Sequence, residues 1–165
     1  GQSRSVRNDR PVIAQFGVNK EGSGDMYYKG ALMLNTIRHI INDDAKWWKL
    51  LYNYSETYKK QIIDTKTVID YFNKESGLDL TSVFNQYLTT TKIPKLVLSK
   101  TGNKLSYEWQ NVNTDFKMPV DIVINEKTIR LHPTTSKQET KIDKKIKLEN
   151  IQVKTNQFFI KVEKK

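Results

Sequence analysis

The chain has 165 residues, 37% of them hydrophobic, which is enough for one ordinary domain or two small ones with a buried core. It has no cysteine, which excludes disulfides, thiolate metal sites and catalytic thiols. The formal net charge of +10 raises the question of an anionic partner. No apolar run approaches the roughly 20 residues that cross a bilayer, so no membrane span is expected, and the localisation is unknown from the sequence.

The first half of the chain has the hydrophobic spacing of helices. Apolar residues recur there at intervals of three and four, which predicts four helices, at about 25–41, 45–59, 65–76 and 80–88. Their expected N-caps are Asp25, then Asp43 or Asp44, then Asp64 or Thr65, and finally Asp79, and Gly77 is the expected stop of the third helix. The chain is therefore expected to begin with a helical segment.

Two features inside these helices carry specific expectations. Glycine within a helix costs about 1 kcal/mol relative to alanine, so Gly30 predicts a close approach by another backbone. The second helix has a broad apolar and aromatic stripe, which predicts burial in a helix-on-helix core. The stripe consists of Trp47, Trp48, Leu50, Leu51, Tyr54 and Tyr58.

From Lys95 onward apolar residues alternate with polar ones, which predicts around seven short strands. Hairpin turns are expected at 101–103, 125–127 and 155–156. The alternating residues are Leu96, Leu98, Leu105, Tyr107, Trp109, Val120, Ile122, Ile124, Ile129, Leu131, Ile146, Leu148, Phe158, Ile160 and Val162. Helices followed by strands predict an α+β fold, with a helical part at 1–94 and a small β-sandwich at 95–165.

A glycine-rich loop, Gly22-Ser23-Gly24, runs directly into the first predicted helix, which opens with Tyr27-Tyr28-Lys29-Gly30-Ala31. This run resembles the Tyr-x-Lys-Gly-Ala signature of the zinc aminopeptidase N family, the gluzincins, in which the first tyrosine stabilises the oxyanion of the tetrahedral intermediate. Alignment on Lys29-Gly30 places that tyrosine at Tyr27. Without the resemblance, Tyr27 would be an ordinary aromatic residue at a helix start.

A second part of the chain, residues 64–94, resembles the same family. It has Ser76-Gly77-Leu78-Asp79-Leu80, then the helix Phe84-Asn85-Gln86-Tyr87-Leu88, and then Ile93-Pro94. Tyr87 stands where the family usually has tryptophan. The resemblance implies that an immunoglobulin-like β domain follows the helices.

The resemblance implies that the chain is the C-terminal portion of a zinc-dependent aminopeptidase, which removes N-terminal residues from peptides. His39 and His132 are the only histidines, and no His-Glu-x-x-His motif is present. Zinc is therefore expected in the intact parent and not in this chain, and the isolated chain is expected to be inactive. The expected partners are an upstream catalytic domain of the same polypeptide and a peptide substrate. A start at Gly-Gln-Ser instead of methionine fits a processed or truncated product.

Several residues near Tyr27 have two interpretations. Tyr28 competes for the oxyanion role if the register shifts by one, but the variable second position of the signature favours packing. Lys29 is either a general acid or clamp for a substrate carboxylate, or a solvated or salt-bridged structural lysine. Asp25 is either an N-cap or a catalytic carboxylate, and the cap is the simpler interpretation.

The basic residues leave a rival function open. The densest group, which is Lys137, Lys141, Lys144, Lys145 and Lys147, alternates with Ile142, Asp143 and Ile146. It is either a solvated face or a surface for a polyanion, and the lack of arginine clusters and binding motifs argues against nucleic acid. The rivals are therefore a stand-alone basic binding or scaffolding module, and a non-catalytic peptidase relative that has lost its zinc site.

Overall fold

The computed structural model describes the backbone of residues 24–58 and 64–165, and the side chains of residues 29–58 and 64–165. Helices come first and strands follow, so the predicted α+β class is confirmed. The chain divides into two compact units, Gly1–Thr91 and Lys92–Lys165, and each is described by itself. The assignment of residues 1–94 to a gluzincin catalytic domain and of 95–165 to a sandwich domain stays a prediction.

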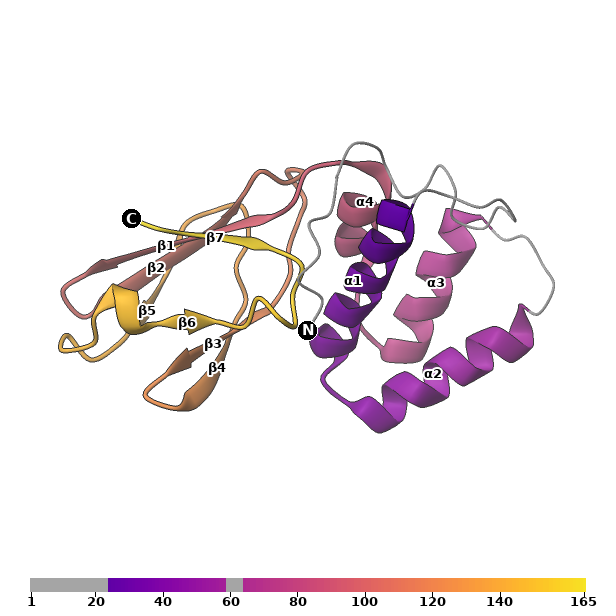
Figure 1. The fold of residues 1–165 in the computed structure, drawn as a ribbon, viewed down its shortest axis with the longest axis horizontal. Helices are drawn as coiled ribbons and strands as arrows, with labels where there is room; N and C mark the ends of the chain where they lie inside the picture. The colour runs from indigo at the N-terminus through magenta and orange to yellow at the C-terminus, as the bar shows by residue number, and fades with distance from the viewer. Residues whose placement is uncertain (1–23, 59–63) are drawn as a thin grey trace. The chain divides into compact units, whose positions relative to one another are not determined.

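The helical unit contains the four predicted helices (Figure 1). They are α1 (Gly24–Ile41), α2 (Asp44–Thr57), α3 (Thr65–Ser76) and α4 (Thr81–Thr89). The carboxylate of Asp43 caps α2 by accepting the N–H of Lys46, and that of Asp64 caps α3 by accepting the N–H of Thr67. Gly77 ends α3 in the left-handed conformation, with φ +74°, which glycine adopts without strain.

Three details of the helices differ from the prediction. Helix α1 begins at Gly24, so Asp25 lies in its first turn instead of at the cap. Leu80 is at the N-cap position of α4, while the carboxylate of Asp79, one residue earlier, accepts the N–H of Thr81 at 3.1 Å. Gly30 has no described atom within 4 Å of the place where a Cβ would sit, so the expected close approach is wrong for the part of the chain that the structure describes.

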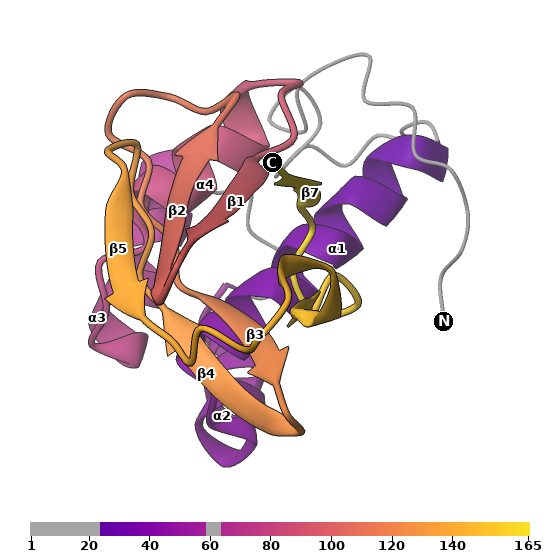
Figure 2. The same cartoon turned by 90° about the vertical axis from the view of Figure 1, so that its left-hand side faces the viewer.

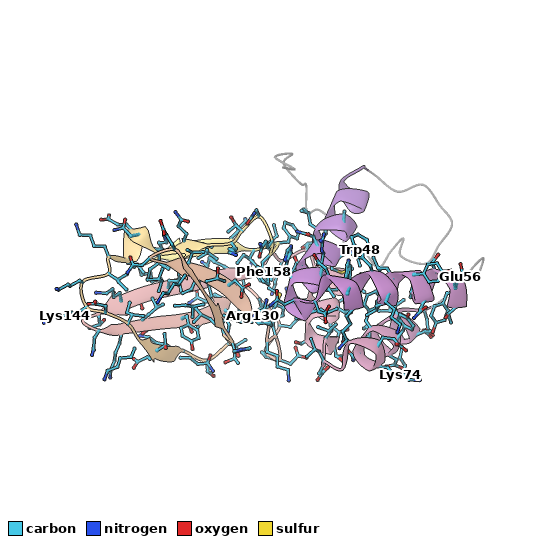
Figure 3. All side chains as sticks on the ribbon, turned by 90° about the horizontal axis from the view of Figure 1, so that it is seen from below. Trp48, Glu56, Lys74, Arg130, Lys144 and Phe158 are labelled. Atoms are coloured by element: carbon cyan, nitrogen blue, oxygen red, sulfur yellow. The ribbon has the colours of Figure 1, made fainter. Side chains whose placement is uncertain are left out.

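Aromatic rings fill the centre of the helical unit. The ring of Phe72 on α3 lies 6.2 Å from that of Trp47 and 5.3 Å from that of Phe84, between centroids. Trp48, in contrast, is 56% exposed, and its ring lies 5.3 Å from the guanidinium carbon of Arg38 (Figure 3). Neighbouring residues point about 100° apart on a helix, and here Trp47 is buried with 3% exposed while Trp48 points to the solvent side of α2. The predicted burial of Trp48 is wrong.

The second unit consists of seven described strands in two sheets. They are β1 (Lys95–Thr101), β2 (Lys104–Gln110), β3 (Val120–Ile124), β4 (Lys127–Leu131), β5 (Gln138–Lys141), β6 (Gln152–Val153) and β7 (Lys161–Lys164). One sheet has the order β5-β2-β1-β7 (Figure 2). The other has the order β4-β3-β6. Strand β7 is parallel to β1, and the other pairs are antiparallel.

Two of the three predicted hairpins are present. Gly102, with φ +61°, lies in the turn between β1 and β2, and Asn125 and Glu126, with φ +50° and +66°, join β3 to β4. The turn at Thr155-Asn156 separates β6 from β7, which belong to different sheets, so the third hairpin is wrong.

The strand predictions fail at further places. Phe158 and Ile160 precede β7 and are not in a strand, and the pattern had not indicated β6. Ile146 and Leu148 are not in a strand, because Leu148 opens the 3₁₀ helix η2 (Leu148–Asn150), and the pattern had not indicated β5. The β unit thus has two sheets, while its immunoglobulin-like form stays a prediction. No helix in the described part of the chain is long and apolar enough to cross a membrane.

Candidate functional site

The predicted oxyanion residue, Tyr27, lies in the first turns of α1, where the backbone is helical. The side chains of Tyr27, Tyr28 and Asp25 lie outside the described residues. The roles assigned to Tyr27, Tyr28 and Asp25 therefore stay predictions, and the site is built from the residues that hold the start of α1 in place.

Lys29 is the first residue of α1 with a described side chain, and it is almost fully buried, with 2% exposed. Its ammonium Nζ donates a 2.8 Å hydrogen bond to the main-chain carbonyl of Thr90, the C-cap residue of α4. Burial lowers the pKa of Lys29, because it disfavours the charged form. The expectation of a solvated lysine is wrong, and the described ion pairs do not include Lys29.

The acceptor for Lys29 is itself held by a short polar network at the end of α4. The hydroxyl of Thr90 donates to the carbonyl of Gln86 at 2.8 Å, and the side-chain amide of Gln86 donates to the Thr90 hydroxyl at 3.1 Å. Gln86 is completely buried. These contacts fix the last turn of α4, where carbonyl groups lack partners within the helix.

A second polar contact joins α1 to α4 further along the helix. The hydroxyl groups of Thr36 and Tyr87 are hydrogen-bonded, and Thr36 also donates to the carbonyl of Leu32 at 2.8 Å. Burial strongly raises the pKa of Tyr87, and the bond to Thr36 opposes this only in part. Thr36 follows Lys29 by seven residues, about two turns, so both lie on the same side of α1. Helix α1 is thus tied to α4 at two levels.

The histidines do not form a metal site with other described residues. His39 is in α1 and His132 follows β4. Within residues 29–58 and 64–165, no group of three or more His, Asp and Glu side chains could hold a metal ion. The expectation that zinc is bound by the intact parent is not tested by this chain and stays a prediction.

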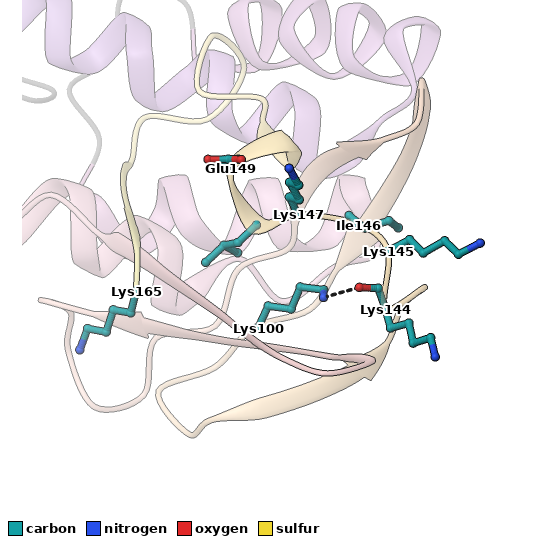
Figure 4. Close-up of a pocket in the computed structure, with 8 residues that line it drawn as sticks. Lys100, Lys144, Lys145, Ile146, Lys147, Glu149 and Lys165 are labelled. Carbon is teal, nitrogen blue, oxygen red and sulfur yellow. Dashed lines mark hydrogen bonds between the residues drawn. The ribbon is translucent and has the colours of Figure 1, made fainter.

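A lysine-lined hollow of about 540 Å³ lies in the β unit (Figure 4). It is lined by Lys100, Lys144, Lys145, Ile146, Lys147, Leu148, Glu149 and Lys165. Lys100 Nζ donates to the carbonyl of Lys144 at 2.9 Å, which holds the loop after β5 against β1. Three members of the predicted lysine group line this hollow, and Lys137 and Lys141 do not.

The positive charge of the chain is concentrated in the unit with the hollow. Residues 92–165 contain 16 Lys and Arg against 8 Asp and Glu, a formal charge of +8, whereas residues 1–91 contain 12 against 10, a formal charge of +2. The hollow itself has five lysines and one glutamate. It is therefore suited electrostatically to an anionic group.

Comparisons with known proteins give a fold but no family. No family model matches the chain, and no curated protein matches it. Among solved structures, aminopeptidase A of Legionella pneumophila in complex with aspartic acid is similar, with a TM-score of 0.67 and 12% sequence identity over 86% of this chain. This chain spans only 18% of the length of that enzyme. The chain therefore has the fold of a portion of an aminopeptidase.

Proposed function

We propose that this chain is the C-terminal portion of a zinc-dependent aminopeptidase of the gluzincin type, and that Tyr27 stabilises the oxyanion. The similarity of 86% of the chain to part of the Legionella aminopeptidase supports the aminopeptidase part of this proposal, and the gluzincin type and the role of Tyr27 rest on the sequence resemblance. The Tyr27–Ala31 run, at the start of α1, supports it. The parent would remove N-terminal residues from peptides, and the β unit would be its immunoglobulin-like domain.

The chemistry expected of this chain is the donation of one hydrogen bond. A tyrosine hydroxyl has an ordinary pKa of about 10, so at neutral pH it holds its proton and can donate it to a developing oxyanion. The described residues do not fit zinc, because they provide no group of ligands for it. As the family resemblance implies, zinc and the general base would come from an upstream catalytic domain of the same polypeptide.

The test is Tyr27→Phe in the full-length parent, with Tyr28→Phe as the matched control. The loss of one oxyanion donor lowers kcat by about 10² to 10³. Tyr27→Phe is expected to show this loss with unchanged folding, and Tyr28→Phe to remain close to the wild type. Near-normal turnover in Tyr27→Phe would exclude the assigned role. A parent that has no His-Glu-x-x-His sequence upstream of Gly1 would point instead to a non-catalytic peptidase relative.

A second candidate function is a basic binding module that docks an acidic partner or polyanion. The lysine-lined hollow favours it, together with the +8 charge of the β unit. The 165-residue chain would then bind heparin and elute at a salt concentration set by the number of contacting lysines. Lys144→Gln combined with Lys145→Gln would elute earlier than Lys49→Gln combined with Lys74→Gln, which removes the same charge from the helical unit. Equal elution of the two double variants would exclude the hollow as the binding surface.

A further inference from the structure

The burial of Lys29 is unusual for a lysine. An ammonium group removed from water costs several kcal/mol unless its contacts compensate for it. The described contact is one hydrogen bond, from Nζ to the Thr90 carbonyl. A methionine would have about the same length and no desolvation cost, so a purely packing role would not require a lysine here.

The hydrogen bond of Lys29 joins residues far apart in the sequence and lies near the N-terminal end of α1. The first turn of a helix has N–H groups without partners within the helix, and helix ends fray. Lys29 is the sixth residue of α1, and its acceptor Thr90 is 61 residues away in sequence. The acceptor lies at the C-terminal end of α4, where the partial negative charge of the helix favours a cation.

The position of Tyr27 depends on this end of α1. Tyr27 precedes Lys29 by two residues, which is about 3 Å along the helix axis. The second contact between the helices, Thr36 to Tyr87, lies about two turns beyond Lys29, so it restrains the middle of α1 more than its start. Among the described contacts, the bond from Lys29 is therefore the one nearest to Tyr27.

We propose that Lys29 is a positioning residue, whose ammonium ties the first turns of α1 to the end of α4 and so holds Tyr27 where the oxyanion forms. This inference rests on the proposed function. It assigns Lys29 no contact with the substrate, unlike a general acid or a carboxylate clamp. Because misplacement of a reacting group by about 1 Å can lower turnover about 100-fold, the loss of such a tie should appear in kcat.

The test is Lys29→Met in the full-length parent. Its matched control is Lys46→Met, because Lys46 on α2 also donates to a main-chain carbonyl, that of Ser76, at 2.7 Å. Lys29→Met is expected to lower kcat at least tenfold with KM within twofold of the wild type, while Lys46→Met keeps kcat. Lys46 is exposed and Lys29 is buried, so their effects on stability can differ, and the melting temperature of each variant is measured to establish that it is folded at the assay temperature. The pH profile of kcat should keep its shape, since Lys29 does not transfer a proton in this role.

Other outcomes overturn the inference in distinguishable ways. If Lys29→Met has the same kcat as Lys46→Met, the hydrogen bond from Lys29 does not serve to position Tyr27. If Lys29→Met loses the alkaline limb of the pH profile of kcat, Lys29 acts as a general acid. If Lys29→Met does not fold, Lys29→Gln is the second variant, because its shorter side chain cannot reach Thr90. A lowered kcat in folded Lys29→Gln enzyme supports the positioning role, and an unchanged kcat excludes it. A parent without aminopeptidase activity would exclude the proposed function, and this role with it.

Discussion

The indole N–H of Trp109 donates a 3.0 Å hydrogen bond to the main-chain carbonyl of Met118. Trp109 is on β2, in the four-stranded sheet, and Met118 lies just before β3, in the three-stranded sheet. The bond therefore joins the four-stranded sheet to the segment that leads into β3. Only 1% of Trp109 is exposed, and the ring of Phe116 meets it edge-on, with centroids 5.5 Å apart. Trp109 is therefore a central residue of the β-unit core.

Trp109→Phe is expected to destabilise the β unit by about 2–4 kcal/mol. The change leaves the Met118 carbonyl without its buried donor, which costs about 1–3 kcal/mol, and the smaller ring adds a cavity. Denaturant unfolding of the 165-residue chain measures the loss. Trp48→Phe removes the same atoms at an exposed position and should change the stability by less than about 0.5 kcal/mol. Equal effects would contradict the central role of Trp109.

Two glycines should respond to alanine in opposite directions. A Cβ at Gly30 meets no described atom within 4 Å, so Gly30→Ala should stabilise α1 by up to about 1 kcal/mol through helix propensity. Gly77 has equal space but φ +74°, so Gly77→Ala should destabilise by about 1 kcal/mol through backbone strain. Thermal unfolding distinguishes the two. A destabilising Gly30→Ala would indicate that something outside the described residues approaches that position.

Tyr87 should make the helical unit sensitive to alkali. Burial raises its pKa above the ordinary value of 10.0, so above pH 10 the unfolded chain loses a proton that the folded chain keeps. The contribution to stability is therefore complete below pH 10 and declines as the pH rises further, by up to about 1.4 kcal/mol per pH unit. Tyr87→Phe should reduce this decline, as measured by urea unfolding between pH 9 and 11. Tyr52→Phe, at a position 66% exposed, is the control, and the same slope in both variants would contradict the prediction.

Asp121 and Arg130 should be coupled more strongly than an exposed ion pair. They face each other across β3 and β4, and the guanidinium donates two hydrogen bonds to the carboxylate, at 2.8 and 3.3 Å (Figure 3 labels Arg130). A double-mutant cycle with Asp121→Asn and Arg130→Gln should give a coupling of about 1–2 kcal/mol. The exposed Lys66–Asp70 pair should give less than about 0.5 kcal/mol. Equal couplings would show that the partial burial of Asp121 has no energetic effect.

The helices could be predicted because their signals are local. Hydrophobic spacing, the caps Asp43 and Asp64 and the stop at Gly77 all lie within the segments they define. Strand β5 could not be predicted in this way, because Gln138–Lys141 has no apolar alternation and is held by its ladder with β2. The alternation of Ile146 and Leu148 belongs instead to a turn and a 3₁₀ helix.

Only part of the candidate site could be predicted from the sequence. Tyr27 came from a family resemblance, and its role stays a prediction. The burial of Lys29 had a local signal, because Lys29, Met33, Thr36 and Ile40 recur at helical spacing and all are buried. The identity of the acceptor for Lys29 had no signal in the sequence, because Thr90 is 61 residues away and accepts through its main-chain carbonyl. Contacts of this kind follow from tertiary packing and leave no residue pattern.

The parallel pairing of β7 with β1 has a consequence for the order of synthesis. Strand β1 is the first strand of its unit to leave the ribosome, and β2 follows directly to form a hairpin with it. Its other edge stays open until residues 161–164 have been made. During translation the helical unit can complete its short-range contacts early. The edge of β1 that later pairs with β7 stays unpaired until β7 has been made, and an unpaired strand edge is a site of aggregation during that interval.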